Sequence, residues 1–580
     1  MNPKRVLIVG GVAGGASAAA RARRLSEQAE IIVFERGQYV SFANCGLPYF
    51  VGGEIKRAQD LLVQTSASLR ARFNLDVRVQ HEVIAIDRAA RCVRVRDLTQ
   101  QTDYEEPYDA LILATGAVPI EPPIPGLDRP GHFTVRTVPE AEQMVAWLEQ
   151  TGAQRAVVVG GGYIGLEMAE QLRRRGLAVS LVEALPQVMT PLDPEMAAWL
   201  HRELRAHQIE LHLADGVVGF EEPQPGERAG ASMVVLRSGK RLPADVVVLG
   251  LGVRPEVTLA REAGLELGAL GGIRVNEHLQ TSDPHIWAVG DAIEVRDPIT
   301  GAWTWVPLAG PANRQGRIAA DNVFGRRSSY RGTWGTAILR LFSLTVGCTG
   351  ANEKTLRRAG IRYQALHLHP GSHAGYYPGA EPIALKILFD PQTGKLLGAQ
   401  AVGKDGVDKR IDVFATALQA GLTVDQLAEL ELAYAPPYGS AKDPVNLAGM
   451  AAQNVLAGDV TLAQWYEVEP FASIPGLGSP TTQQDGAQAG CLVLDVRTAA
   501  ERQKGCIPGS VHIPLDQLRA RLAELPKDRE IIVACQSGQR SYFACRLLSQ
   551  HGFRVRNLTG SFRTWSVAAS DLGAGHSPAG

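Results

Sequence analysis

Short apolar runs alternate with glycine-rich turns and helical patterns along most of the chain. Residues 6–9 and 156–159 are the clearest examples, because each run ends at a glycine and leads into a helical pattern. A second, mostly apolar run follows each of them, at 31–34 and 179–182. Short apolar runs bounded by turn signals are typical of strands buried in a parallel sheet. The pattern therefore predicts an α/β fold containing two strand–helix–strand units.

Each unit has a glycine-rich turn and, at a similar distance, an acidic residue. The turn glycines are Gly10, Gly14 and Gly15 in the first unit, and Gly160, Gly162 and Gly165 in the second. Glu35 and Glu183 follow the first glycine by 25 and 23 residues. Such glycines let the backbone approach a pyrophosphate, the helix N-terminus attracts its charge, and the acid binds ribose hydroxyls. Two dinucleotide sites are predicted, although Val12 replaces the second glycine of the first turn; two merely glycine-rich turns are the alternative.

Two further predicted strands end in small residues. One covers 108–113 and leads to Thr115 and Gly116, and the other covers 281–289 and leads to Gly290 and Asp291. The order of these segments relative to the two glycine turns carries the family resemblance given below, and that resemblance implies that these four residues lie near the first dinucleotide.

Cys45 lies 35 residues after Gly10, beside the expected position of the first dinucleotide. No second cysteine occurs within five residues, so a redox role for this thiol requires a partner sulfur supplied by a substrate. Gly46 and Pro48 suit the first turn of a helix, where free N–H groups and the helix dipole favour a thiolate. The alternative is a small buried apolar residue, which is the more common state of a cysteine.

Length and composition exclude several classes of protein. The 580 residues suggest about four domains. Lys+Arg 59 against Asp+Glu 60 gives no basic surface for nucleic acid. The seven irregularly spaced cysteines form no Cys-x-x-Cys pair, so we expect no metal site, no disulfide framework and a cytoplasmic location. No uninterrupted apolar stretch reaches about 18 residues, so we expect no membrane span.

The C-terminal part has its own α/β pattern. Residues 451–484 include Gly-, Pro-, Ser- and Thr-rich stretches and are predicted to be a linker. Apolar runs then lead to Asp495 and Arg497 and, later, to Cys535, which opens the loop Cys535-Gln-Ser-Gly-Gln-Arg540-Ser541. A strand-to-helix turn aims backbone N–H groups at the sulfur and stabilises a thiolate or persulfide. Arg540 adds positive charge for an anionic donor.

The order of glycine turn, Ala-Thr-Gly, second glycine turn and Gly-Asp resembles the flavoprotein disulfide reductases with two dinucleotide-binding domains. The resemblance implies two Rossmann-like domains and an α+β dimerisation domain, followed here by an α/β tail. The implied ranges are 1–120 and 246–325 for the FAD-binding domain, 121–245 for the NAD(P)H-binding domain, 326–450 for the dimerisation domain and 485–570 for the tail. It also implies that Glu35 binds the FAD ribose, and that Asp291 lies near the FAD ribityl or phosphate groups. Glu183 favours NADH over NADPH, with NADPH as the alternative.

The run Ser41-Phe-Ala-Asn-Cys45-Gly-Leu-Pro-Tyr49 looks like the coenzyme A disulfide reductase branch, which uses a single cysteine. Oxidases and peroxidases with a single cysteine carry a histidine in the first glycine turn, where this chain has Ala13. The resemblance implies a homodimer in which tyrosines of the opposite subunit approach the cysteine. It further implies coenzyme A contacts on and near the first helix, with a solvated helix face as the alternative for the arginines. The implied tyrosines are Tyr376, Tyr434 and Tyr438, and the implied coenzyme A contacts are Ser17, Arg21, Arg24, Ser41 and Asn44.

The tail resembles rhodanese, through Leu-Asp-Val-Arg at 494–497, Ile-Pro-Gly at 507–509 and the Cys535 loop. It departs from the rhodanese pattern at Cys506 and at Gly560-Ser561, and an inactive scaffold is the alternative. The fusion predicts an FAD-dependent NAD(P)H reductase of coenzyme A disulfide, coenzyme A persulfide or polysulfide, with Cys535 handling small sulfane-sulfur species. The rival functions are an NADH oxidase or peroxidase, and a sulfurtransferase with a redox-sensing flavoprotein part.

Overall fold

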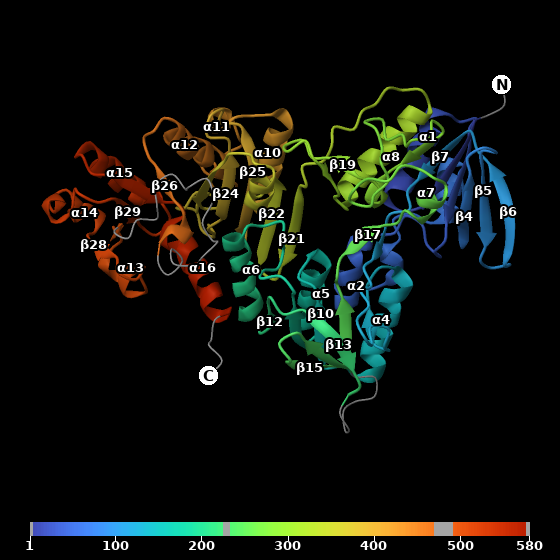
Figure 1. Cartoon of the computed structure of the whole chain (residues 1–580), viewed down its shortest axis with the longest axis horizontal. Helices are drawn as coiled ribbons and strands as arrows, with labels where there is room; N and C mark the ends of the chain where they lie inside the picture. The colour runs from blue at the N-terminus through green and yellow to red at the C-terminus, as the bar shows by residue number, and fades with distance from the viewer. Residues whose placement is uncertain (1–3, 224–231, 469–490, 576–580) are drawn as a thin grey trace. The chain divides into compact units, whose positions relative to one another are not determined.

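The computed structural model describes residues 4–223, 232–468 and 491–575 (Figure 1). Contacts divide the chain into two compact units. The first unit is Met1–Pro186 with Gln208–Thr333, and the second is Gln187–His207 with Trp334–Gly580. No helix of the described residues has the length and apolar character needed to cross a bilayer.

The first sheet of the first unit is parallel throughout. Its order is β18 (Ile286–Ala288), β7 (Ala110–Leu113), β1 (Arg5–Val9), β2 (Glu30–Glu35) and β3 (Asp76–Val79). Strands β1 and β7 are almost wholly buried, as expected for apolar strands in the middle of such a sheet. Helix α1 (Ala13–Leu25) packs against α8 (Ala309–Val323), so a segment from late in the unit completes the domain that the first residues begin.

The second sheet repeats this plan. Its order is β12 (Glu210–His212), β11 (Ala178–Val182), β10 (Arg155–Val159), β16 (Val246–Leu249) and β9 (His132–Phe133), again parallel throughout. Helix α5 (Tyr163–Arg174) contacts β10 and β11. The two predicted strand–helix–strand units are therefore confirmed. The predicted domain boundary at 246 differs from the structure, because β16 still pairs with β10 of this sheet.

Two antiparallel three-stranded sheets accompany the parallel sheets of the first unit. One consists of β4 (His81–Asp87), β5 (Cys92–Asp97) and β6 (Thr102–Pro107), and the other of β13 (Val217–Glu221), β14 (Ser232–Leu236) and β15 (Arg241–Ala244). Helices α2 (Leu47–Gly52) and α4 (Val138–Thr151) contact each other, and α2 also contacts α5.

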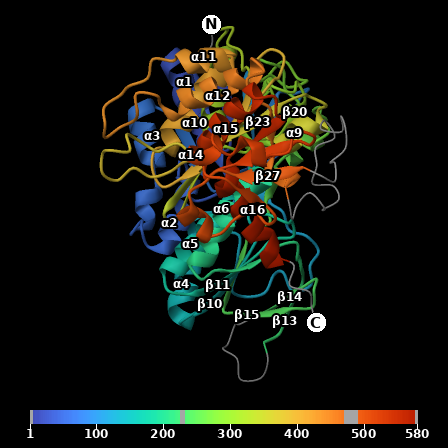
Figure 2. The same cartoon turned by 90° about the vertical axis from the view of Figure 1, so that its left-hand side faces the viewer.

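The second unit begins with an antiparallel sheet. Its order is β21 (Ala337–Leu341), β22 (Leu344–Gly350), β25 (Leu396–Gly403), β24 (Ala384–Phe389) and β23 (Gln364–Leu368). Helix α10 (Val407–Ala420) covers β22 and β25, and α11 (Val424–Glu429) packs on α12 (Pro444–Leu456). Helix α6 (Pro194–Ala206) belongs to this unit, although the sequence placed residues 121–245 together in the NAD(P)H-binding domain. The helix contacts β25 and α16 (Ser561–Gly575), which lies beside it in both views (Figures 1 and 2).

A second, parallel sheet forms the C-terminal part of this unit. Its order is β26 (Leu462–Ala463), β30 (Val555–Leu558), β29 (Ile531–Ala534), β27 (Leu492–Asp495) and β28 (Val511–His512), and α15 (Gln539–Gln550) contacts β29 and β30. The predicted linker, 451–484, differs from the structure at its start. Residues 451–456 complete α12, and β26 pairs with β30, because apolar residues such as Leu462 and Ala463 are buried in this sheet. Residues 469–484 lie outside the described residues.

The C-terminal part is hydrogen-bonded to the edge strand β23 of the antiparallel sheet. The Gln464 amide donates to the Ala365 carbonyl at 3.0 Å. The His367 N–H donates to Thr559 Oγ1 at 2.7 Å, and the Gly560 N–H donates to the His367 carbonyl at 3.2 Å. These bonds satisfy backbone groups that an edge strand otherwise exposes.

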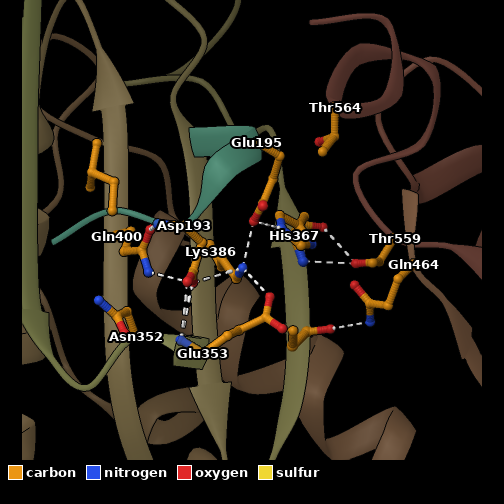
Figure 3. Close-up of polar contacts among 12 residues, drawn as sticks. Asp193, Glu195, Asn352, Glu353, His367, Lys386, Gln400, Gln464, Thr559 and Thr564 are labelled. Atoms are coloured by element: carbon orange, nitrogen blue, oxygen red, sulfur yellow. Dashed lines mark hydrogen bonds and ion pairs between the residues drawn. The ribbon is translucent and has the colours of Figure 1, made fainter. Parts of the chain in front are cut away.

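Four charged side chains form a buried ion cluster in the second unit, defined as Asp193, Glu195, Glu353 and Lys386 (Figure 3). Lys386 Nζ lies 2.9 Å from Asp193 Oδ2 and 2.5 Å from both Glu195 Oε1 and Glu353 Oε1. The Lys386 side chain is fully buried although it belongs to strand β24. His367 Nε2 lies 2.8 Å from Glu195 Oε1 and extends the cluster towards the C-terminal part. Among the described residues, Asp193, Glu195 and Glu353 lie close enough together to hold a metal ion. The Lys386 ammonium group contacts all three of them and supplies the positive charge instead.

Candidate active sites

A cavity of about 770 Å³ lies at the carboxyl ends of β1, β2 and β7 in the first unit. Gly10, Glu35, Asn44, Thr115 and Gly116 all line it. Four of the residues predicted for the first dinucleotide site therefore lie around one cavity, together with Asn44, which was predicted to contact coenzyme A. A cavity of this size suits an organic cofactor, since such sites usually measure roughly 300–1,000 Å³.

The first glycine turn is tightly packed against its surroundings. Gly10 has a φ of +98°, and a Cβ there would lie 2.2 Å from the Ala114 carbonyl oxygen. A Cβ on Gly15 would lie 1.8 Å from the Gly10 carbonyl oxygen, so helix α1 can begin this close to the turn only with glycine. The Glu35 carboxylate accepts the Gly11 N–H at 2.9 Å, which fixes the acid at the mouth of the turn.

Gly290 and Asp291 follow strand β18 of the same sheet. The Gly290 N–H donates to Gln315 Oε1 at 2.7 Å, and the Trp305 indole donates to the Asp291 carbonyl at 2.7 Å. Burial raises the pKa of the Asp291 carboxyl. The Asp291 charge in turn helps to raise the pKa of Cys45, which brings these two predicted residues into one electrostatic environment.

Cys45 lies in a short 3₁₀ turn, Asn44–Gly46, directly before helix α2. Its side chain is exposed, so the alternative of a buried apolar cysteine is wrong. Partial desolvation raises the pKa of the thiol, and the Glu167 carboxylate raises it further, whereas a backbone hydrogen bond lowers it. Together these effects raise the pKa of the Cys45 thiol, opposite to the direction expected from a helix N-terminus. The neighbouring residue Asn44 lines the large cavity, and its buried Oδ1 atom accepts no hydrogen bond from another described residue, which suits a bound donor.

The second glycine turn repeats the geometry of the first. A Cβ on Gly165 would lie 1.9 Å from the Gly160 carbonyl oxygen, which again admits only glycine where the helix begins. Open space surrounds the Cβ position of Gly162, so a phosphate can approach the backbone there. The Glu183 carboxylate accepts the Gly161 N–H at 2.7 Å.

The residues predicted to contact coenzyme A occupy different environments in the first unit. Ser17 donates to Asn313 Oδ1 at 2.5 Å, and Arg21 pairs with Asp321 at 2.6 Å, so both contact helix α8. Arg24 is exposed. Ser41 begins the run that contains Cys45. Its φ is +48°, a backbone conformation that residues other than glycine rarely adopt.

In the second unit, Tyr376 and Tyr434 form a pair. Their hydroxyl oxygens lie 2.8 Å apart, and this hydrogen bond raises the pKa of Tyr376. Both side chains are exposed, as is Tyr438. Three large exposed phenols on neighbouring loops are consistent with a surface that meets another molecule.

Cys535 is buried at the end of β29, where its loop turns into α15. The Gly538 N–H and the Ser541 hydroxyl donate to its sulfur at 3.1 and 3.3 Å. Arg540 forms a bidentate ion pair with Glu501, at 2.8 and 2.6 Å, and this pair lowers the pKa of Glu501 to about 2. The predicted hydrogen-bond donors around the Cys535 sulfur are therefore present. The Arg540 charge, however, is already paired with the Glu501 carboxylate.

Ser561 stands where the rhodanese pattern has the second glycine of a pair, and its functional role was not predicted from the sequence. Its φ is +55°, the conformation that the missing glycine would adopt. Its buried hydroxyl accepts the Cys535 N–H at 2.6 Å. The serine therefore supplies a hydrogen bond to the Cys535 backbone that glycine cannot make.

Comparison with known proteins matches three parts of the chain to family models. The model described as pyridine nucleotide-disulphide oxidoreductase matches residues 4–316. The dimerisation domain of the same family matches residues 336–444, and the rhodanese-like domain matches residues 479–568. Together the matched ranges correspond to the α/β sheets and the antiparallel sheet described above.

Relatives and solved structures agree with these matches. Coenzyme A disulfide reductase of Staphylococcus haemolyticus is 35% identical over 453 residues, covering 78% of this chain and 100% of the relative. NADH oxidase of Methanocaldococcus jannaschii is also 35% identical, over 77% of this chain and 97% of the relative. The crystal structure of reduced CoADR-RHD from Bacillus anthracis is 48% identical, with a TM-score of 0.93 over 98% of this chain and 99% of that one. A NAD-dependent persulfide reductase from A. fulgidus is 37% identical, with a TM-score of 0.87 over 97% and 100%. The chain therefore belongs to the pyridine nucleotide-disulphide oxidoreductase family and carries a C-terminal rhodanese-like domain.

Proposed function

We propose that the chain is an FAD-dependent NAD(P)H reductase of coenzyme A disulfide and coenzyme A persulfide or polysulfide, with a rhodanese domain that handles sulfane sulfur. The observation that carries the proposal is Cys45, an exposed, unpaired thiol whose neighbour Asn44 lines the large cavity of the first unit. A lone thiol in this position requires its disulfide partner to arrive with the substrate. The names of the relatives supply the class of substrate.

The residues of the first unit fit a bound FAD. The cavity has the size for it, Gly10 and Gly15 allow close approach of the backbone, and the orphaned Asn44 Oδ1 offers an acceptor. Glu35 would bind the adenosine ribose, and Thr115, Gly116, Gly290 and Asp291 would contact the remaining groups. When bound, FAD carries two electrons from the nicotinamide to a disulfide.

The second turn would hold NADH. The open space at Gly162 would accept the pyrophosphate, and Glu183 would bind the ribose hydroxyls. A 2′-phosphate would meet the Glu183 charge, so NADH is the preferred nucleotide and NADPH the weaker alternative.

Cys45 would act as a nucleophile. Its thiolate attacks the coenzyme A sulfur of the persulfide, which forms a Cys45–coenzyme A disulfide and releases hydrosulfide. Two electrons then reduce this disulfide, and coenzyme A leaves as a thiol. Ser17, Arg21, Arg24, Ser41 and Asn44 would hold the substrate, which for Arg21 means sharing its Asp321 ion pair.

The chain would work as a homodimer, consistent with its dimerisation domain. Tyr376 and Tyr434 of the partner would then donate a proton to the leaving thiolate or hold it by hydrogen bonds, with Tyr438 nearby. Their existing hydrogen bond would be exchanged for one to the substrate.

The rhodanese domain would supply or accept sulfane sulfur at Cys535. The Gly538 N–H and the Ser541 hydroxyl would stabilise the thiolate and the persulfide, and Arg540 would attract an anionic donor.

Steady-state rates with NADH test the proposal against coenzyme A disulfide, coenzyme A persulfide, polysulfide and oxygen. Cys45→Ser is expected to abolish reduction of all the sulfur acceptors. Cys535→Ser is expected to slow turnover with sulfane donors and to spare direct reduction of coenzyme A disulfide. The NADH oxidase name of one relative makes oxygen the important control. If the rate of oxygen consumption exceeds the rate of reduction of every sulfur acceptor, the proposed function is wrong and the protein is an NADH oxidase.

A further inference from the structure

A second cavity, of about 340 Å³, lies within the second unit beside the Cys535 loop. Helix α6 contributes Trp199 and Arg202, the antiparallel sheet and its loops contribute His369 and Lys404, and the rhodanese domain contributes Arg563. Its apolar lining consists of Leu344, Pro382, Ala384, Val402 and Val567. An apolar cavity with a few polar groups on its walls is the usual form of a small-molecule site.

Two of its cations, Arg202 and Arg563, form no direct ion pair among the described residues, although the Glu203 charge acts on Arg202 against the desolvation that lowers its pKa. Within the described residues, no hydrogen bond or ion pair is made by the guanidinium of Arg202 or Arg563; Arg202 instead lies over the Trp199 ring, 4.5 Å from its centre. Desolvation lowers the pKa of Arg563, and the charge of Arg202 lowers it further. Lys404 lies 3.7 Å from Glu381, which also lines the cavity. Two neighbouring arginines that form no ion pair among the described residues favour an anionic ligand.

His369 provides a second, independent sign of a ligand. Its Nε2 atom lies 2.8 Å from the Thr564 hydroxyl, while its buried Nδ1 atom has no partner of good hydrogen-bond geometry among the described residues, although the Gly560 backbone also acts on the ring. Burial lowers the pKa of His369 well below its usual range. A buried polar nitrogen on a cavity wall is normally satisfied by a bound molecule or water.

The cavity adjoins the sulfur-transfer loop directly. Gln536, which follows the nucleophile Cys535, lines it. The Arg563 N–H donates to the Gln536 carbonyl at 3.0 Å, and the Phe562 N–H donates to the Cys535 carbonyl at 3.1 Å. An anion held by Arg563 is therefore held next to the loop that carries the reacting sulfur.

We propose that this cavity binds the phosphate-bearing end of coenzyme A while its terminal sulfur exchanges with Cys535. The inference rests on the proposed function, which makes coenzyme A the sulfur carrier. At about 340 Å³ the cavity falls in the size range of sites for organic molecules, and its two arginines match phosphate groups. In the exchange, the Cys535 thiolate attacks the terminal sulfur of coenzyme A persulfide. One S–S bond breaks and one forms, so coenzyme A leaves as a thiolate, Cys535 becomes a persulfide and no external electrons are needed.

The test measures persulfide formation on Cys535 by mass spectrometry in the full-length protein, with Cys45→Ser present throughout to stop reduction at the other thiol. The donors are coenzyme A persulfide, pantetheine persulfide, which lacks the nucleotide phosphates, and thiosulfate. Arg202→Ala combined with Arg563→Ala is expected to raise the half-saturating concentration of coenzyme A persulfide about tenfold or more relative to pantetheine persulfide. Lysine at both positions is expected to restore part of the preference. Arg529→Ala, an exposed arginine of the rhodanese domain outside the cavity, is the matched control.

Equal changes with the two persulfides, or none, would overturn the proposal. A rise confined to thiosulfate would also overturn it and would assign the cavity to a small dianion. NADH-dependent reduction of coenzyme A disulfide is measured in parallel with Cys45 intact. Its absence from the wild type would refute the proposed function, whatever happens at Cys535.

Discussion

Replacing Lys386 by methionine removes the cation that contacts all three carboxylates of the buried ion cluster. Three carboxylates, those of Asp193, Glu195 and Glu353, lie within 2.5–2.9 Å of its ammonium group in a fully buried site. Removing one partner of a buried ion pair typically destabilises a protein by about 3–5 kcal/mol, because the other charge remains buried. For a unit of this size, each kcal/mol lost from the free energy of unfolding lowers the unfolding temperature by roughly 2–4 °C. Lys386→Met is therefore expected to lower the unfolding temperature of the second unit by about 6–20 °C.

The pH dependence of this loss has a defined sign. In the wild type, the attraction of Lys386 opposes desolvation and leaves the pKa of Glu195 and of Glu353 below its usual range. Their stabilisation is therefore present above the unfolded pKa and lost as pH falls through the folded pKa. The pKa of Lys386 itself is raised, so its contribution is present at neutral pH and lost only in strong alkali. Without the lysine, burial raises the carboxyl pKa values, and the deficit of the variant is expected to shrink between pH 8 and pH 5.

Calorimetry of Lys386→Met and wild type at pH 8 and pH 5 measures both effects. Hydrogen exchange of peptides from β24 assigns the affected transition, because the two units need not unfold together. Lys395→Met, at an exposed position of the same unit, controls for loss of a lysine. A shift of less than about 2 °C at pH 8, or a deficit that grows on acidification, would refute the reasoning.

Three further outcomes are expected. Ser561→Ala leaves the buried Cys535 N–H without an acceptor, which is expected to destabilise the rhodanese domain by about 1–3 kcal/mol and to slow thiocyanate formation from thiosulfate and cyanide. Unchanged activity and stability would contradict this. Glu167→Gln removes a charge that raises the pKa of Cys45, so the pH midpoint of Cys45 alkylation is expected to fall; an unchanged or higher midpoint would refute the assigned cause. Glu183→Ala is expected to narrow the preference for NADH over NADPH, measured as the ratio of kcat/KM values, and an unaltered ratio would remove Glu183 from nucleotide selection.

The α/β fold and both glycine turns could be predicted because their signals are local. The glycines that admit no side chain, such as Gly15 and Gly165, each lie within one strand–turn–helix unit. Glu35 is the last residue of the next strand, and Glu183 directly follows the corresponding strand in the second unit. The Cys535 loop could be predicted for the same reason, since its donors Gly538 and Ser541 follow within six residues.

What the sequence did not reveal depends on contacts between distant segments. Helix α6 groups with the second unit because it packs on β25 and α16, which no local periodicity indicates. Lys386 interrupts an apolar strand, and its three acids lie 33 to 193 positions away in the sequence. The raised pKa of Cys45 could not be predicted for the same reason, because two of the charges that raise it, those of Glu167 and Asp291, belong to distant segments of the chain. The role of Ser561 had one signal in the sequence, because a serine stands where the rhodanese pattern has the second glycine of a pair.

The hydrogen bonds between the rhodanese domain and β23 have a practical consequence for dissecting the protein. A chain cut after Leu456 would lose Gln464, Thr559 and Gly560, and with them the partners of the Ala365 and His367 backbone. The edge strand β23 of the antiparallel sheet would then expose unpaired backbone groups, which could pair with a second copy of the fragment. Activities measured on an isolated reductase fragment should therefore be compared with the intact protein only after its state of association is known.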